Sequence, residues 1–172
     1  MLERSELRIA PWTPAAEPYR WQRAIHADDP ARRLGVVRTH ERWIPFLRKI
    51  EIFETDDDAL LLSLTRAWFG PAWQVRDSEG QHVGTLLPDA LLDPAGFPFA
   101  TRIPEPPDRW RLREPTGREY ATLARSPGGV EILRFTDERL TNPFLRMMVL
   151  GGFLLLDPLP RSSRQAGGGR LD

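Results

Sequence analysis

The feature that most constrains the fold of this chain is an apolar segment near its C-terminal end. Residues 143–156 contain a single charged side chain, Arg146. Asn142 before them is a favourable N-cap, Pro143 suits the first position of a helix, and Pro158 follows the end of the run, so the pattern predicts a helix over 143–156. Because this helix is apolar on every side, it must be enclosed by protein or lie in lipid.

The length of the helix distinguishes these two environments. At about 1.5 Å per residue, its roughly fourteen residues reach about 21 Å, which is short of the roughly 30 Å hydrocarbon core of a bilayer. We therefore expect a buried core helix and no transmembrane span. A close approach of strands would explain its two glycines, which cost about 1 kcal/mol each relative to alanine. The expected core residues of the helix are Met147, Leu150, Gly151, Gly152, Phe153 and Leu154.

The part of the chain before the helix alternates between short extended runs and turns. Three turns begin with an acid and end with glycine, a preference of type I turns and hairpins: Asp77–Gly80, Asp93–Gly96 and Glu114–Gly117. Many short strands at this spacing predict an all-β barrel or sandwich. The runs expected as strands are Lys49–Glu54, Ala59–Arg66, Trp73–Arg76, Val83–Leu87, Phe97–Ile103, Trp110–Arg113, Glu119–Ala124 and Val130–Phe135.

One hairpin pattern occurs twice in this region. Trp73–Asp77 followed by Gly80 has the same pattern as Trp110–Glu114 followed by Gly117. In each copy, aromatic and aliphatic side chains alternate with arginines, so the arginines are expected on the opposite face of the strand. The repeat supports a regular β structure.

The two ends of the chain carry weaker signals. Residues 1–33 combine aromatic residues with several prolines, and we expect them to pack on the barrel with little regular structure, with Leu7–Ala10 as an edge strand. Residues 158–172 include three consecutive glycines and are expected to form a disordered tail. The length of 172 residues favours a single domain, placed at 34–157.

Together these patterns resemble the tubby-like C-terminal superfamily, which includes the LURP-one-related proteins and the phospholipid scramblases. The similar stretches are Ile52–Glu54 with its acidic turn, Trp73–Gly80 and Asn142–Asp157. The last is similar to the terminal helix of the scramblases, which also has small residues in its middle and ends on an aspartate. The resemblance implies a closed antiparallel β-barrel of about twelve strands around a central C-terminal hydrophobic helix.

The resemblance also implies a function. It points to a domain without catalytic activity that binds anionic lipid headgroups or phosphoinositides at a membrane surface; a soluble protein-interaction scaffold and phospholipid scrambling are the alternatives. The calcium site proposed for scramblases lies just before the helix, where this chain has Asp137 and Glu138 but Leu140 and Asn142 in place of further aspartates. A calcium ion takes about six to eight oxygen ligands, so no calcium binding is expected. The cysteine-rich palmitoylation segment of many scramblases is also missing.

Composition and motifs argue against an enzyme, a metal site or a cofactor. The chain has no cysteine, which excludes disulfides, Cys-ligated zinc and thiol catalysis. Its three histidines fall on separate elements, and it has no Gly-x-Ser-x-Gly elbow and no phosphate-binding glycine loop. Cationic and anionic side chains number 24 each, which disfavours a nucleic-acid partner. The acidic cluster Asp56–Asp58 is expected to be a solvated hairpin turn.

Arginine carries the remaining functional signal. A guanidinium group binds phosphate oxygens in a bidentate manner, and a neighbouring Trp suits the headgroup region of a membrane. The alternative is that these cations only solubilise the outer face of the barrel. We expect a cytoplasmic protein with peripheral membrane contact, whose partner is an anionic lipid or another protein. The candidate lipid-phosphate residues are Arg38, Arg42, Arg48, Lys49, Arg76 and Arg113.

Overall fold

The computed structural model describes residues 3–27, 31–40, 49–54, 58–66, 70–126, 128–136 and 142–156. These residues form a 13-stranded sheet and one helix, α1 (Pro143–Leu154). The strands are β1 (Glu6–Ile9), β2 (Thr13–Pro14), β3 (Tyr19–His26), β4 (Arg33–His40), β5 (Lys49–Glu54), β6 (Leu60–Arg66), β7 (Trp73–Asp77), β8 (His82–Leu86), β9 (Ala90–Leu92), β10 (Pro98–Glu105), β11 (Arg109–Arg113), β12 (Glu119–Arg125) and β13 (Glu131–Phe135).

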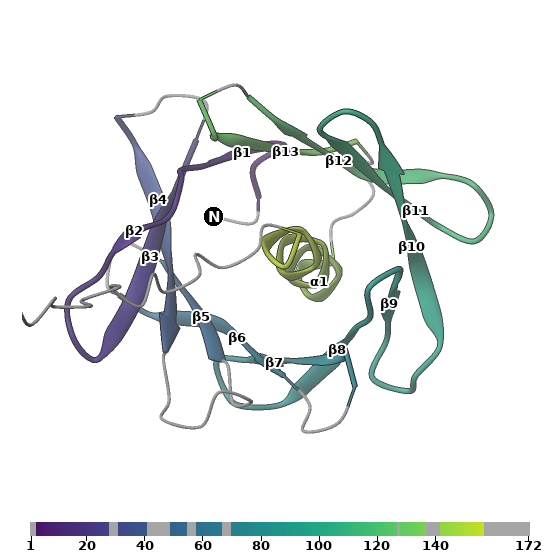
Figure 1. Cartoon of the computed structure of the whole chain (residues 1–172). Helices are drawn as coiled ribbons and strands as arrows, with labels where there is room; N and C mark the ends of the chain where they lie inside the picture. The colour runs from purple at the N-terminus through teal and green to yellow at the C-terminus, as the bar shows by residue number, and fades with distance from the viewer. Residues whose placement is uncertain are drawn as a thin grey trace, which may run out of the picture.

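The sheet closes on itself into a barrel (Figure 1). From β2 to β13 each strand pairs with the next one in the sequence, and β13 then pairs with β1. The ring is completed by β1 and β3, where Arg8 lies opposite His26 and Ile9 opposite Ile25. The short β2 pairs with β3 and lies outside the ring of twelve strands. The predicted closed antiparallel barrel of about twelve strands with one helix is confirmed.

The strand sequences explain how the wall separates core from solvent. On β5, Ile50 and Ile52 are buried in the core, whereas Lys49 and Glu51 alternate with them and therefore lie on the outer face. Closure gives every strand of the ring two neighbours, which removes the open edges that an unclosed sheet would present.

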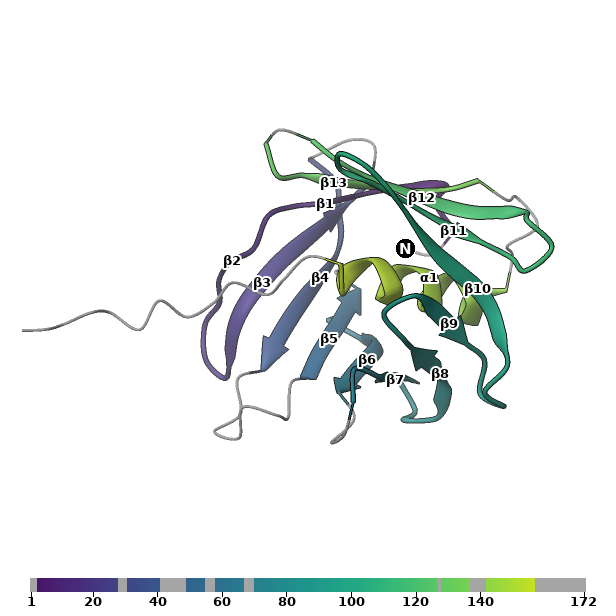
Figure 2. The same ribbon diagram turned by 45° about the vertical axis from the view of Figure 1, so that its right-hand side comes forward.

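α1 occupies the interior of the barrel (Figures 1 and 2). The side-chain oxygen of Asn142 accepts a hydrogen bond from the backbone N–H of Phe144, and Pro143 occupies the first turn, as predicted. The helix ends at Leu154, with the next residue as its C-cap, so the predicted end at Leu156 is wrong. Within the described ranges, no helix has the length and apolar character needed to cross a membrane.

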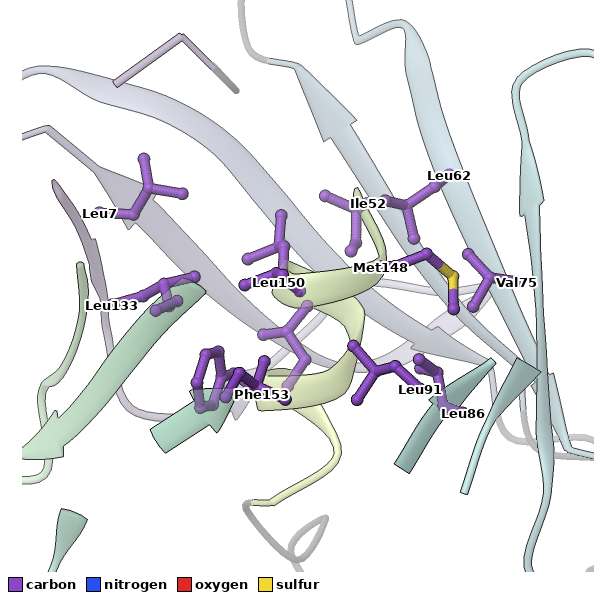
Figure 3. Packing of buried hydrophobic residues seen from close by; sticks show 14 of the residues in the cluster. Leu7, Ile52, Leu62, Val75, Leu86, Leu91, Leu133, Met148, Leu150 and Phe153 are labelled. Carbon is purple, nitrogen blue, oxygen red and sulfur yellow. The ribbon is translucent and has the colours of Figure 1, made fainter. Parts of the chain in front are cut away.

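The second half of α1 is enclosed on all sides. Every residue from Met148 to Leu154 is buried, including the predicted core residues from Leu150 onwards. The predicted core residue Met147 is half buried and packs against the same cluster. Figure 3 shows the helix side chains lying between Leu133 of β13 on one side and Leu91 of β9 on the other.

Two glycines allow α1 to lie close to the wall. A Cβ added at Gly151 would lie 3.1 Å from Cδ2 of Leu64 on β6, which is tight for a real contact. A Cβ added at Gly84 on β8 would collide with the backbone oxygen of Leu92 and lie 2.7 Å from Cε of Met148. The expectation that strands approach both helix glycines closely is therefore confirmed at Gly151, whereas a Cβ added at Gly152 would lie at an ordinary 3.4 Å from Cδ2 of Leu91.

The N-terminal residues are more regular than we expected. They contribute β1 and β3 to the ring, so the prediction of an irregular extension over 1–33 is wrong. The strand expected at Leu7–Ala10 is present as β1, but its expected position at an edge is wrong, because β1 has partners on both sides, β13 and β3. The physical reason is closure: without β1 the barrel would have an unpaired seam, and Leu7 and Ile9 would lose a fully buried position. The predicted tail, 158–172, lies outside the described residues.

The duplicated hairpin is confirmed as two hairpins, β7–β8 and β11–β12. Each turn ends in a glycine with a positive backbone angle, φ 80° at Gly80 and 94° at Gly117, where other residues would be strained. Each pair also contains a register shift at the equivalent place, after Val75 in one hairpin and after Leu112 in the other. The repeated sequence therefore encodes a repeated turn and bulge.

Candidate functional site

The predicted cationic residues lie on two separate parts of the barrel wall. Cross-strand pairing aligns Arg38 on β4, Glu51 on β5, Ser63 on β6 and Arg76 on β7 in one row across the sheet. Lys49 belongs to the same outer face, two residues along β5 from Glu51. Arg113 is on β11, four strands beyond β7, so the sheet does not bring it to this row. The other two candidates, Arg42 and Arg48, lie outside the described residues.

Carboxylates neutralise two of the cations on this face, Arg38 and Lys49. A nitrogen of the Arg38 guanidinium lies 3.3 Å from Oδ1 of Asp58, and the guanidinium also stacks 5.1 Å from the ring centre of Tyr19 and 5.0 Å from that of Phe53. Nζ of Lys49 lies 2.6 Å from Oε1 of Glu51. These two cations therefore meet a phosphate only in competition with an internal partner.

The pKa of Glu51 shows how strongly negative charge offsets the cations on this face. Burial raises the pKa of its carboxyl, but hydrogen bonds with Lys49 and His40 outweigh that effect, so the pKa lies below its ordinary value. Glu51 therefore stays ionised beside Lys49 at neutral pH. Its negative charge works against recruitment of an anionic ligand to this part of the wall.

The remaining two predicted residues, Arg76 and Arg113, have guanidinium nitrogens that are bonded to or buried within the protein itself. Nη1 of Arg76 donates a hydrogen bond of 2.8 Å to the backbone oxygen of Gly80, which supports the β7–β8 turn. Nε of Arg113 is buried and has no hydrogen-bond partner. Among the residues that the structure describes, the predicted set does not converge on one phosphate-sized site.

A pocket lies at the end of the barrel where α1 begins. Its volume is about 360 Å³. It is bounded by the β7–β8 turn, the β9–β10 turn and the first residues of α1. Its apolar lining comes from Val83, Phe99, Phe144, Leu145 and Met148. The walls of this pocket are thus mainly hydrophobic, as in most small-molecule sites.

Three local hydrogen-bond motifs fix the edges of the pocket. Oδ1 of Asp77 accepts from the backbone N–H groups of Glu79 and Gln81, at 3.0 and 2.8 Å. Oδ1 of Asp93 accepts from the backbone N–H of Phe97 at 2.9 Å. The N-cap of α1 is the third motif. The acids that begin the two turns therefore shape the backbone and also place carboxylates in the pocket lining.

Two aromatic side chains are exposed at this end of the barrel. Phe97 is 69% exposed and Phe144 is 48% exposed, and they are the exposed large hydrophobic residues of the described chain. Phe144 lines the pocket, while Phe97 follows the turn that contributes Asp93 and Pro94 to it. The pocket therefore has an apolar interior, two carboxylates and exposed aromatic rings around it.

The opposite end of α1 carries a cation. The Arg102 side chain on β10 donates from Nη2 to the backbone oxygen of Gly152 at 2.9 Å and from Nη1 to that of Pro88 at 2.8 Å. Burial lowers the pKa of Arg102, and the nearby Asp89 carboxylate partly opposes this effect. The guanidinium caps the C-terminal end of the helix, where the macrodipole favours positive charge.

A buried charge cluster closes the seam of the barrel. Arg23 on β3 is 1% exposed; its Nη2 lies 2.9 Å from Oε2 of Glu131, and its Nε donates to the backbone oxygen of Ala10. Nη2 of Arg125 lies 2.8 Å from the other Glu131 oxygen. This cluster joins β1, β3, β12 and β13, so we interpret it as part of the fold. No sequence pattern predicted this cluster.

The pocket was not predicted either, although the order of the strands contains a signal for it. In an up-and-down antiparallel sheet, alternate turns lie at the same end. The β7–β8 turn and the β9–β10 turn therefore share one end, and both contribute residues to the pocket lining, together with the start of α1. Compared with family models, curated proteins and solved structures, the chain has no match.

Proposed function

We propose that this chain is a lipid-contacting domain without catalytic activity, which meets a membrane surface with the end of the barrel where α1 begins. The observation that carries the proposal is the exposure of Phe97 and Phe144 at that end. Peripheral membrane contacts insert side chains such as phenylalanine at the boundary between headgroups and acyl chains. The resemblance to the tubby-like superfamily points in the same direction and stays a prediction.

The expected affinity of the domain for a membrane is low. Complete burial of a phenylalanine side chain contributes about 1.5–3 kcal/mol, so two rings contribute at most about 3–6 kcal/mol. A single myristoyl chain binds membranes with an association constant of about 10⁴ M⁻¹, which corresponds to about 5.5 kcal/mol. The domain would therefore bind reversibly, and its stable attachment would need a second contact.

The proposal moves the membrane contact away from the predicted cationic face. Arg38 and Lys49 already have carboxylate partners, and the pocket lining contributes Asp77 and Asp93. We therefore expect no preference for anionic over zwitterionic lipids at this end. Headgroup binding through Arg42 and Arg48 remains a separate prediction.

Vesicle flotation tests the proposal. The intact chain should float with phosphatidylcholine vesicles, and vesicles with added phosphatidylserine should give similar binding. The double variant Phe97→Ser, Phe144→Ser should lose most of it. Ser78→Ala, at an exposed position in the neighbouring β7–β8 turn, is the control and should bind like the parent.

Two results would contradict the proposal. Equal flotation of the double variant and the parent would show that the phenylalanines do not contact the membrane. No flotation with either type of vesicle would remove the lipid function and favour the protein-interaction scaffold.

A further inference from the structure

The pocket beside the first turn of α1 has the size and the lining of a small-molecule site. Its volume of about 360 Å³ lies within the range of about 300–1,000 Å³ that ligand pockets occupy. For comparison, an engineered apolar cavity of about 150 Å³ is large enough to bind benzene. Leu145, Met148 and Phe99 line the pocket, and the flexible methionine can adapt to chains of different shape.

The charges in the lining select for a cation. Asp77 and Asp93 are the acidic residues that line the pocket, and its described lining contains one basic residue, His82, but no Arg or Lys. Each aspartate uses Oδ1 to accept hydrogen bonds from backbone N–H groups of its own turn, which leaves Oδ2 able to accept from a ligand. A ligand with an ammonium group would satisfy these oxygens with charge-assisted hydrogen bonds.

The N-terminus of α1 does not make the pocket favour an anion over a cation. Pro143 has no N–H group, and the N–H of Phe144 is already bonded to Oδ1 of Asn142. The macrodipole adds the equivalent of about half a positive charge, whereas the two aspartates carry a full negative charge each. An anionic headgroup is therefore disfavoured at this helix terminus.

We propose that the pocket binds an amphiphile that carries an aliphatic tail and a protonated amine. The tail lies against Met148, Leu145 and Phe99, and the ammonium group donates to the carboxylates of Asp77 and Asp93. This inference goes beyond the proposed membrane contact, because it assigns a discrete ligand class to a bounded site. The amine could belong to a free alkylamine or to the headgroup of an aminophospholipid, and both present the same chemistry.

A series of probes that share one tail tests the charge selection. Octylamine, octanol and octanoate would be titrated into the intact chain at pH 8, where an alkylamine is protonated. We expect octylamine to bind at least about tenfold more tightly than octanoate, a difference of about 1.4 kcal/mol, with octanol between them. Equal or tighter binding of octanoate would overturn the proposal.

Methyl NMR locates the ligand. Octylamine should shift the methyl signal of Met148, which lines the pocket. Binding with no shift of the Met148 signal would place the amine elsewhere and would also overturn the proposal.

Two substitutions test the role of the carboxylates. Asp77→Asn and Asp93→Asn keep an oxygen that can accept the backbone hydrogen bonds and remove the charge. Each should weaken octylamine binding by about fivefold to tenfold and leave octanol binding unchanged. The matched control is Glu114→Gln, at the equivalent position of the β11–β12 hairpin. An octylamine affinity that is unchanged in both Asn variants would refute the assignment.

Vesicles distinguish the two sources of the amine. If phosphatidylethanolamine in phosphatidylcholine vesicles increases flotation, and Asp77→Asn removes the increase, the amine is lipid-borne. If octylamine binds but phosphatidylethanolamine adds nothing, the ligand is a free amine. If the parent chain does not float with vesicles but still binds octylamine, only the proposed membrane contact is rejected. The two proposals can therefore fail separately.

Discussion

At its C-terminal end α1 is held by Arg102, whose guanidinium bonds to the backbone oxygen of Gly152, whereas at its N-terminal end Phe144 is half exposed beside a pocket. The burial of the residues also increases along the helix from its N-terminal to its C-terminal end. Residues 142–144 are exposed, 145–147 are half buried, and 148–154 are buried. One continuous apolar segment therefore provides the core of the barrel and, with its first turn, part of the surface.

The difference between the two ends has an energetic meaning. A buried leucine or phenylalanine contributes about 1.5–3 kcal/mol to folding, and an exposed one forgoes most of that contribution. The second half of α1 stabilises the barrel in this way, while Phe144 contributes little to the fold. A large apolar side chain with little role in folding is available for binding, which is why we place the function at the N-terminal end.

The largest effect is expected from a charge in the enclosed half. Leu150→Asp would bury a carboxylate without a partner in a site that is now 0% exposed, and such a change belongs to the class that costs more than about 4–5 kcal/mol. The variant should fail to fold, as seen in circular dichroism and in the dispersion of its NMR spectrum. Phe144→Asp in the first turn of the same helix is the control and should fold. A folded Leu150→Asp variant would mean that α1 is not enclosed.

The next largest effect is expected at the contact between helix and wall. In Gly84→Ala, the new methyl group would collide with the backbone oxygen of Leu92, which cannot move as a side chain can. Overpacking of this kind costs about 1–3 kcal/mol or more, and urea denaturation should show the loss. In the control Gly152→Ala, the nearest atom, Cδ2 of Leu91, is at an ordinary 3.4 Å. The gain in helix propensity should leave that variant at least as stable as the parent.

The parts of the fold that could be predicted from the sequence are the local ones. The helix, its N-cap and the two similar hairpins are local features, so the spacing of apolar residues, Asn142, Gly80 and Gly117 was enough to predict them. The closure of the barrel depends on β1 pairing with β13 across almost the whole chain. Local patterns carry no information about such distant pairs, which is why residues 1–33 were misjudged.

The charged residues were harder to predict for the same reason. Arg23 and Glu131 are 108 residues apart and form an ion pair with both side chains buried. A sequence pattern gives each of them the appearance of a surface residue, because charged side chains are seldom fully buried. For the cationic face, the sequence indicated where Arg38 and Lys49 lie but not that Asp58 and Glu51 neutralise them.

A smaller effect is expected at the capped end of the helix. Arg102→Met keeps a long side chain but leaves the backbone oxygens of Gly152 and Pro88 without this donor. Hydrogen bonds to charged groups contribute about 1.5–3 kcal/mol, so unfolding by urea should show a loss of about 2 kcal/mol. Amide hydrogen exchange should accelerate first in the last turn of α1. The control is Arg76→Met, which also loses a bond to a backbone oxygen, that of Gly80, but at an exposed site; an equal loss in both variants would contradict the proposed cap.

The smallest effect on stability is expected at the N-terminal end of α1, and it tests the comparison of the two helix ends most directly. Phe97→Ser with Phe144→Ser removes two large apolar side chains, yet both are exposed, so the free energy of unfolding should change by less than about 0.5 kcal/mol. Phe153→Ser, in the same helix but fully buried, should cost about 3–5 kcal/mol, as large-to-small core substitutions do. Urea denaturation of the three proteins gives both numbers. If the double variant lost several kcal/mol, the first turn of α1 would belong to the core like the rest of the helix, and the exposed rings would no longer be free to bind a membrane.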